Sequence, residues 1–409
     1  MDLIPALQIA RPGAQRSPYR PHRLKALARV DELVHNYRGI VAEQKRAIAD
    51  GALAVWNGLM WDNSFLFACD AIPLQIGELW RDEHIQSQHV GEADFQIPEE
   101  FCAPGKAIAG RLHLWRNVTG KRILVFGTGC DPRSISYEML KSDGYQVYTI
   151  DGVTANPLEF DPKRHEAYVE YLTKEIEGLA IWLTGRPSDE DRLRAEIRFR
   201  NKVLSRMQRI IDLRRLNPLL LPQSLMMPLG MGASHYYGNR EGYLQALDAV
   251  IEELEIQTGL TEPAEYVPIV ITGILATILR TVEESGGAIV ASVRFGSELY
   301  REDIPPVESI ARYLLNCQLR GEGHDVSGAF AAQRRYLVED LFHQTKARGI
   351  ISGGLISCPY FDMAAQLDQD YFRKKRIPFL TVQSPGTGPE SLPGEDQVTR
   401  VKAFIEMLS

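Results

Sequence analysis

Apolar residues at helical spacing occupy much of the N-terminal and central parts of the chain. They recur with this period over residues 21–50 and again over residues 162–216. Within the second stretch, Gly185-Arg-Pro187 interrupts the period, and Ser188 and Asp189 supply the cap of the helix that follows. The pattern therefore predicts an N-terminal helix and two long amphipathic helices in the middle of the chain.

Less regular segments lie around these helices. A helix is expected to begin after Asp62-Asn-Ser64 and to end at Pro73. Residues 217–238 are rich in Pro, Leu, Met and Gly, which predicts a loop. A further helix over Glu241–Gln257 leads to Thr261-Glu-Pro263, which is the strongest candidate for a domain boundary.

Short apolar runs that alternate with helical segments predict parallel sheets in two places. In the first place, strand Ile123–Phe126, helix Ile135–Lys141 and strand Tyr145–Ile150 form a β-α-β unit. In the second place, four apolar runs alternate with helices in the same way. These four predicted strands are Val267–Thr272, Ala288–Val293, Gly349–Ile356 and Ile377–Val382.

The alternation of strands and helices defines the expected fold class. It is α/β, with two doubly wound, flavodoxin-like parallel-sheet domains, an N-terminal helical segment and a helical insert. The expected ranges are 1–50 for an N-terminal arm and helix, 51–160 for the first α/β domain, 161–262 for a helical connection and 263–409 for the second α/β domain. A chain of this length is too long for one small core, which agrees with two domains.

Composition and charge narrow the class of protein. Apolar residues make up 44% of the chain and charged residues 24%, as in ordinary soluble globular proteins. The formal net charge of −7 argues against a nucleic-acid partner, which requires a basic surface. The arginines between Arg192 and Arg215 alternate with acids and apolar residues, so a solvated helix face is expected there. No signal-peptide core and no membrane-length apolar run occurs, and we expect a cytoplasmic protein without a membrane partner.

The five cysteines divide into two groups by local sequence. Cys69 and Cys317 lie in apolar or helical segments, where cysteine usually acts as a small buried apolar residue. Cys102, Cys130 and Cys358 lie beside Gly or Pro in loops, which expose functional groups. Cys130 and Cys358 each follow an apolar strand, at the edge where α/β sheets bind ligands. Three such thiolates predict a site for zinc or for an iron–sulfur cluster.

Other sequence features define no catalytic site. The turns Gly127-Thr-Gly129 and Pro385-Gly-Thr-Gly388 lack the Lys-Ser/Thr of a nucleotide-hydrolysing phosphate loop, although such turns can bind the pyrophosphate of coenzyme A. His235 lies in a predicted loop, where a surface or capping role is the commoner one. Three arginines near strand or helix ends of the second domain are expected to be solvated: Arg294, Arg301 and Arg400.

Six short segments occur in a fixed order along the chain. They are Ala71-Ile-Pro73, Phe101-Cys102, Val125-Phe-Gly-Thr-Gly-Cys130-Asp, Ile351 to Cys358, Arg376-Ile-Pro378-Phe-Leu and Thr399-Arg400-Val-Lys-Ala-Phe404-Ile-Glu. None of them is specific alone. Their order, and the order and spacing of the three cysteines, resemble the 2-hydroxyacyl-CoA dehydratase / benzoyl-CoA reductase family over most of the chain.

The resemblance implies a cofactor, partners and a reaction. Family members bind a [4Fe-4S] cluster through three cysteines, which correspond here to Cys102, Cys130 and Cys358, and leave one iron without a protein thiolate. A related sister subunit is implied, in a heterodimer or homodimer, together with a separate ATP-hydrolysing iron–sulfur activator as electron donor. The implied substrate is an acyl-CoA, which is dehydrated through a ketyl radical or, in the reductase branch, reduced.

Two alternatives stay open beside this function. The chain can be a noncatalytic electron-transfer or scaffolding subunit of such a complex, or a structural zinc protein on the same fold. In the family the region corresponding to residues 51–100 shapes the acyl pocket, and here it carries Trp56, Trp61 and Trp80.

Overall fold

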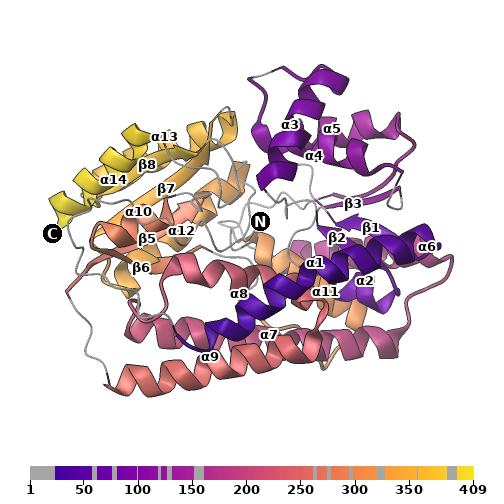
Figure 1. The fold of residues 1–409 in the computed structure, drawn as a ribbon, viewed down its shortest axis with the longest axis horizontal. Helices are drawn as coiled ribbons and strands as arrows, with labels where there is room; N and C mark the ends of the chain where they lie inside the picture. The colour runs from indigo at the N-terminus through magenta and orange to yellow at the C-terminus, as the bar shows by residue number, and fades with distance from the viewer. Residues whose placement is uncertain are drawn as a thin grey trace.

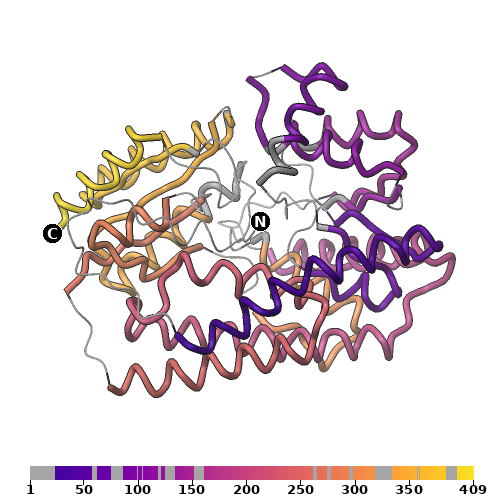
Figure 2. The backbone as a smooth tube through the Cα atoms, viewed as in Figure 1, coloured from indigo at the N-terminus to yellow at the C-terminus, as the bar shows by residue number. Residues whose placement is uncertain are grey.

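The structure is a computed structural model of the 409-residue chain. The residues it describes are 24–57, 62–75, 81–98, 100–117, 121–126, 131–151, 161–260, 265–273, 278–293, 298–319, 328–356, 358–384 and 394–409. They form two parallel sheets with their helices, and long helices run beneath both sheets (Figure 1, Figure 2). The expected α/β class with two parallel-sheet units is therefore confirmed.

The first sheet has four parallel strands in the order β2-β1-β3-β4. They are β1 (Ala54–Asn57), β2 (Ile72–Gln75), β3 (Arg122–Phe126) and β4 (Gln146–Ile150). Because β2 and β3 lie on opposite sides of β1, the strand order reverses between β1 and β3. In open α/β sheets, ligands bind beyond the carboxyl ends of the strands at such a switch point.

The second sheet repeats this arrangement, with four parallel strands in the order β6-β5-β7-β8. They are β5 (Val267–Gly273), β6 (Gly287–Ser292), β7 (Gly349–Leu355) and β8 (Phe379–Ser384). Its switch point lies between β5 and β7. Every residue of β7 is buried, as expected for a central parallel strand that helices cover on both faces.

Helices cover both faces of the first sheet. One layer consists of α3 (Arg81–Phe95), α4 (Ala103–Trp115) and α5 (Asp131–Lys141), and the other contains α2 (Ser64–Ala68), α6 (Pro162–Thr184) and α11 (Pro306–Leu319). Trp56 and Ile123 point into the first layer, whereas Val55 and Leu124 point into the second. This alternation follows from the two-residue period of a strand, and it buries both faces of the sheet.

Two helical layers also cover the second sheet. They are α10 (Leu279–Glu284) with α14 (Glu395–Leu408) on one face, and α12 (Gly328–Gln344) with α13 (Pro359–Lys374) on the other. Ile269 and Ile351 belong to the core under α10 and α14. Val270 and Ile350 belong to the core under α12 and α13.

A third core joins the long helices. They are α1 (Leu27–Ala49), α7 (Glu190–Leu216), α8 (Gln223–His235) and α9 (Arg240–Leu260), with a 3-10 turn at Tyr236–Gly238. The predicted break between α6 and α7 is confirmed: Gly185 ends α6 in the left-handed conformation, and the Asp189 side chain accepts the Arg192 N–H at the start of α7. No helix in the described ranges has the length and apolar character to cross a membrane.

The sequence did not predict β1 and β2, and it placed one helix end wrongly. Both strands have four residues and are too short to show a period. Helix α2 ends at Ala68 rather than at Pro73. Pro73 lies in β2, which is an edge strand, and there its missing N–H does not interrupt a central ladder.

The expected loop over residues 217–238 is also wrong, because residues 223–235 form α8. Pro228 lies inside this helix, where it removes a backbone donor. Met226 and Leu229 are buried in the core of the long helices. This burial offsets the unfavourable effect of the proline.

Helix α11 packs away from the strands that flank it in sequence. It contacts α6 and α7, and its Leu314 and Leu315 belong to the core of the first sheet. The chain therefore crosses from β6 of the second sheet to the first sheet and then returns to α12. The domain ranges given above stay a prediction, and α11 lies in the range assigned to the second domain.

Candidate functional site

Two of the three predicted cysteines follow the strands next to the switch points. Cys130 comes shortly after Phe126, the last residue of β3, and Cys358 comes shortly after Leu355, the last residue of β7. Strands β3 and β7 have the same place in their two sheets. The two sheets therefore present a cysteine at equivalent points of their topology.

Cys102 and Cys358 share a second feature, which is their place at a helix N-terminus. Cys102 is the N-cap of α4 and Cys358 is the N-cap of α13, and a proline follows in the first turn of each helix. Both residues are buried, with 7% and 8% of their surface exposed, and both are reduced. Their expected exposure in loops is therefore wrong. The positive end of a helix dipole favours the thiolate form, which is the form that binds metal.

Cys130 and the turn before it lie outside the described residues. Helix α5 begins at Asp131, the residue directly after Cys130. Among the described residues, no group of three His, Cys, Asp or Glu side chains is arranged to hold a metal ion. That set lacks Cys130, so the predicted three-thiolate site stays a prediction. All three predicted ligands do precede a helix directly.

The other two cysteines have the structural roles that the sequence predicted. Cys317 is 2% exposed and belongs to the core that α11 shares with the first sheet. Cys69 follows α2 and is half-buried. Burial raises the pKa of the Cys69 thiol to about 11, with the nearby Arg192 acting in the opposite direction. This thiol is therefore protonated at neutral pH, and it makes a suitable control for the predicted ligands.

Glycines line the switch point of the second sheet. Gly273 ends β5 with a φ of +78°, and a Cβ atom there would lie 2.0 Å from the carbonyl oxygen of Gly353 on β7. Gly353 and Gly354 follow each other inside β7. Glycines inside strands mark places where a ligand or another backbone comes close. Here Gly273 allows β5 to approach the backbone of β7 closely, and Gly354 allows Phe361 of α13 to pack against β7.

A row of hydroxyl groups lies just below these glycines. Thr272, Ser352 and Thr381 are register partners on β5, β7 and β8, so their side chains share the face covered by α12 and α13. The Thr272 and Thr381 hydroxyls are buried without a hydrogen-bond partner. A buried polar group without a partner destabilises the fold, which indicates a role other than stability.

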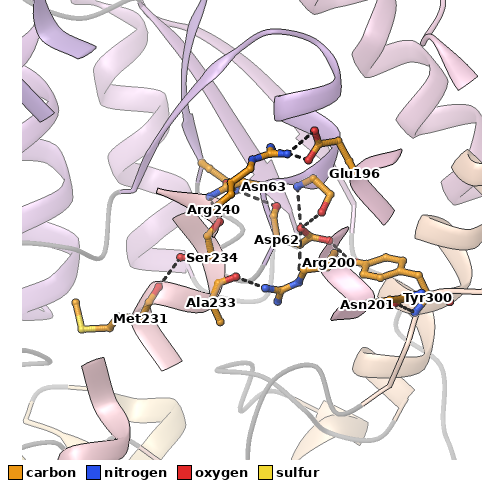
Figure 3. A network of polar contacts seen from close by, with 12 residues as sticks. Asp62, Asn63, Glu196, Arg200, Asn201, Met231, Ala233, Ser234, Arg240 and Tyr300 are labelled. Carbon is orange, nitrogen blue, oxygen red and sulfur yellow. Dashed lines mark hydrogen bonds and ion pairs between the residues drawn. The ribbon is translucent and has the colours of Figure 1, made fainter. Parts of the chain in front are cut away.

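The switch point of the first sheet is fixed by a network of buried polar groups. Figure 3 shows Asp62 between Arg200 of α7 and Tyr300, which follows β6. The Ser64 N–H and hydroxyl both donate to Asp62 Oδ1, at 2.8 and 2.7 Å. Asn57 is the last residue of β1, and its side chain donates to the backbone oxygen of Asp62 at 3.3 Å. The network holds both ends of the connection that leaves β1.

Arg200 is fully enclosed in this network. Its Nε atom lies 3.9 Å from Asp62 Oδ1, and its guanidinium donates to the backbone oxygen of Ala233 near the end of α8. Burial alone would lower its pKa, but Asp62 and nearby tyrosine hydroxyls raise it above the ordinary value. Burial also raises the pKa of Tyr300, so this hydroxyl stays protonated and donates to Asp62. The expectation of a solvated face is wrong for Arg200 and for Arg214, which is 2% exposed.

The position of Cys102 depends on a close contact between α3 and α4. A Cβ atom at Gly110 of α4 would lie 1.8 Å from the Ser87 carbonyl oxygen of α3. The same holds in reverse for Gly91 of α3, whose Cβ would lie 2.5 Å from the Lys106 oxygen. The Lys106 ammonium, one turn after Cys102, is buried and bonds to Glu92 Oε1 at 2.6 Å. Two glycines and one ion pair therefore fix α4 and the cysteine at its start.

Several residues considered from the sequence have structural roles. Trp56 is fully buried in the core of the first sheet, with Trp115 and Arg111 against its ring. His235 has a capping role, because its Nδ1 accepts the Tyr237 N–H at 3.0 Å. Three residues named above lie outside the described residues: Trp61, Trp80 and Arg294.

Comparison with known proteins agrees with this geometry. A family model described as 2-hydroxyglutaryl-CoA dehydratase, D-component, matches residues 62–408. A comparison with curated proteins gives no match. The matched range begins at Asp62 and contains all three predicted cysteines. Because it covers most of the 409 residues, the chain belongs to the 2-hydroxyglutaryl-CoA dehydratase D-component family.

Proposed function

We propose that the chain is the cluster-binding subunit of a cytoplasmic enzyme that dehydrates a 2-hydroxyacyl-CoA. A [4Fe-4S] cluster would be held by Cys102, Cys130 and Cys358. The observation that carries the proposal is the equivalent placement of Cys130 and Cys358 after β3 and β7, at the switch points of two sheets with one strand order. Membership of the dehydratase family supports the reaction class.

The described donors have the chemistry that such a group requires. Cys102 and Cys358 form no disulfide bond and lie at helix N-termini, where the positive end of the helix dipole favours a thiolate. When bound, the cluster would supply one-electron transfer and an iron with an open position that acts as a Lewis acid. The chain's own groups then have two tasks. The glycines of β5 and β7 allow the two strands to approach closely beside the site, and the network around Asp62 fixes Asn57 and Asp62 beyond β1.

The reaction needs an electron because the proton on the β-carbon of the substrate is not acidic. One electron converts the thioester carbonyl into a ketyl radical anion, and the 2-hydroxyl group then leaves as hydroxide. The β-proton becomes acidic and is lost, and the extra electron is returned at the end of the cycle. The sum is loss of one water from the 2-hydroxyacyl-CoA, which becomes a 2,3-unsaturated acyl-CoA, with no net change in oxidation state.

The proposal includes two partners. A related sister subunit would complete the enzyme, and a separate ATP-hydrolysing iron–sulfur activator would deliver the electron. Neither glycine turn of this chain contains a phosphate-loop Lys-Ser/Thr, which agrees with ATP hydrolysis on another protein. Reduction of an acyl- or aryl-CoA uses related chemistry. The activity assay should therefore measure both dehydration and reduction of the thioester substrate.

Anaerobic purification tests the cluster. We expect about four irons and four sulfides per chain, which is the content of one [4Fe-4S] cluster, together with an EPR signal after reduction. Cys130→Ala should remove most of the iron and the signal. Cys69→Ala is the matched control and should retain both, because the Cys69 thiol has a raised pKa and packs against an apolar core.

Three outcomes would contradict parts of the proposal. Zinc without sulfide would favour the structural zinc protein. A Cys130→Ala variant with full iron content would exclude this residue as a ligand. A chain that holds the cluster but, together with its sister subunit and the activator, neither binds nor dehydrates 2-hydroxyacyl-CoA would favour the noncatalytic electron-transfer role.

A further inference from the structure

A pocket lies along the outer edge of the second sheet, away from both switch points. It has a volume of about 310 Å³ and is formed by β8, one face of α13 and the first half of α14. Strand β8 is the last in the order β6-β5-β7-β8, so β7 separates it from the switch point between β5 and β7. The volume is at the lower end of the range for sites that bind small molecules.

The pocket carries a cation and an anion that do not pair with each other. Arg400 of α14 and Asp362 of α13 both line it. Within the described part of the chain, neither side chain forms an ion pair. Asp362 Oδ1 accepts a hydrogen bond from the Gln383 side chain at 2.7 Å, which leaves Oδ2 available. Two opposite charges in one small pocket favour a ligand that carries both charges.

Neutral groups complete the pocket. Ala365, Phe379 and Leu380 supply apolar surface beside the two charged side chains. A short apolar side chain of a bound ligand would cover these residues.

We propose that this pocket binds a small α-amino acid. The ligand carboxylate bonds to the Arg400 guanidinium, whose planar fork fits a carboxylate. The ligand ammonium bonds to Asp362. A phosphate ion is disfavoured because its two negative charges would lie beside the Asp362 carboxylate. A 2-hydroxy acid has the carboxylate but lacks the positive charge, so it binds more weakly.

Binding to the full-length chain at low salt tests the proposal. Calorimetry is carried out with a set of α-amino acids, with their 2-hydroxy acid analogues and with inorganic phosphate. We expect saturable one-to-one binding of at least one amino acid, and at least about 10-fold weaker binding of its hydroxy analogue. Arg400→Gln should weaken amino-acid binding by at least about 10-fold. Lys402 is exposed and lies two residues after Arg400 in α14, so Lys402→Gln should leave amino-acid binding unchanged.

One further variant identifies the anionic contact. Asp362→Asn should remove the preference for the amino acid over the hydroxy acid. No saturable binding of any amino acid, tighter binding of phosphate, or full affinity in Arg400→Gln would overturn the proposal. The readout is binding alone, so the result is independent of the cluster and of dehydratase activity.

Discussion

The two sheets have the same strand order but differ in what surrounds their switch points. Beyond β1 of the first sheet, Asp62 is joined to Arg200 and Tyr300 by charged and polar contacts. In the second sheet, Gly273 at the end of β5 pairs with Gly353 of β7. Among the described residues, polar side chains therefore join one switch point to its helices, whereas close backbone contact joins the strands of the other.

This difference indicates a division of tasks between the two sheets. The first sheet and its helices carry two predicted ligands, Cys102 and Cys130, and the close contact of α3 with α4 fixes the helix that begins after Cys102. The second sheet carries the third predicted ligand, Cys358. Shared topology explains why cysteines follow equivalent strands, whereas the local side chains differ between the two sheets.

The largest expected effect comes from closing the gap between α3 and α4. Gly110→Ala places a Cβ atom 1.8 Å from the Ser87 carbonyl oxygen, so the two helices must separate. We expect the free energy of unfolding to fall by about 4 kcal/mol. Iron content should fall as well, because α4 carries Cys102. Urea unfolding followed by circular dichroism, with iron analysis of the same preparation, measures both.

A matched control exists for this variant. Gly39 lies in α1, and no atom lies within 4 Å of the position that a Cβ would take there. Gly39→Ala should therefore stabilise the helix by up to about 1 kcal/mol. If Gly110→Ala keeps the stability and the iron content of the wild type, the close contact does not fix Cys102.

The second prediction concerns the close approach of β5 and β7 at the switch point of the second sheet. Gly273→Ala combines a left-handed φ of +78° with a Cβ position 2.0 Å from the Gly353 oxygen, and it should cost about 3 kcal/mol. Gly286→Ala has a φ of +90° but open space around its Cβ, so it should cost only about 1 kcal/mol. The difference between the two variants measures the close approach of β5 and β7. Equal losses would show that backbone conformation alone matters.

The third prediction separates stability from function in the hydroxyl row. Thr272→Val removes a buried hydroxyl that has no partner and should raise the free energy of unfolding by about 1 kcal/mol. Thr345→Val is the control, because the Thr345 hydroxyl donates to the Leu341 oxygen at 2.7 Å and its loss should cost about 1 kcal/mol. If the hydroxyl row serves a bound ligand, Thr272→Val loses acyl-CoA affinity while it gains stability. Loss of stability in Thr272→Val would contradict this, because it would mean that the Thr272 hydroxyl has a hydrogen-bond partner in the fold.

Much of the fold was predictable because its elements are long or strongly apolar. The strands β3 to β8 and the break at Gly185 follow from apolar runs and turn residues. Strands β1 and β2 were missed because four buried residues carry no period, and α8 was missed because Pro228 hides its helical pattern. Local sequence does not show that tertiary burial outweighs such a residue.

The candidate site was predictable only in part. The cysteines were found because they follow strands or lie beside Gly and Pro. The buried arginines were missed, although the sequence carries a signal for them. Arg200 and Arg214 occupy the same helical stripe as Leu193, Ile197 and Met207, which are all buried. An arginine at an apolar-stripe position of a long helix predicts burial, but only the tertiary structure identifies Asp62 as its partner.

The smallest expected effect concerns Glu283, a buried acid near the second of the two buried arginines of α7. Arg200 serves the first sheet, whereas Arg214 donates to the Ile289 oxygen of β6 and lies near Glu283, which is 3% exposed. Burial raises the pKa of Glu283, although hydrogen bonds from Ser224 and the charge of Arg214 act in the opposite direction. Because the folded pKa is raised, the contribution of Glu283 to stability is complete below its ordinary pKa and decreases as the pH rises through the folded value.

Glu283→Gln removes this titration and tests it directly. The stability of the variant relative to the wild type should increase as the pH rises from about 4 to 7, across the range where a buried carboxyl with a raised pKa loses its proton. Urea unfolding at several pH values measures the difference. Glu284→Gln alters the neighbouring acid, which is exposed, and its difference from the wild type should not change in the same direction. A constant difference for Glu283→Gln would mean that Ser224 and Arg214 fully compensate the burial of this carboxylate, and that both buried arginines of α7 are paired with ionised acids.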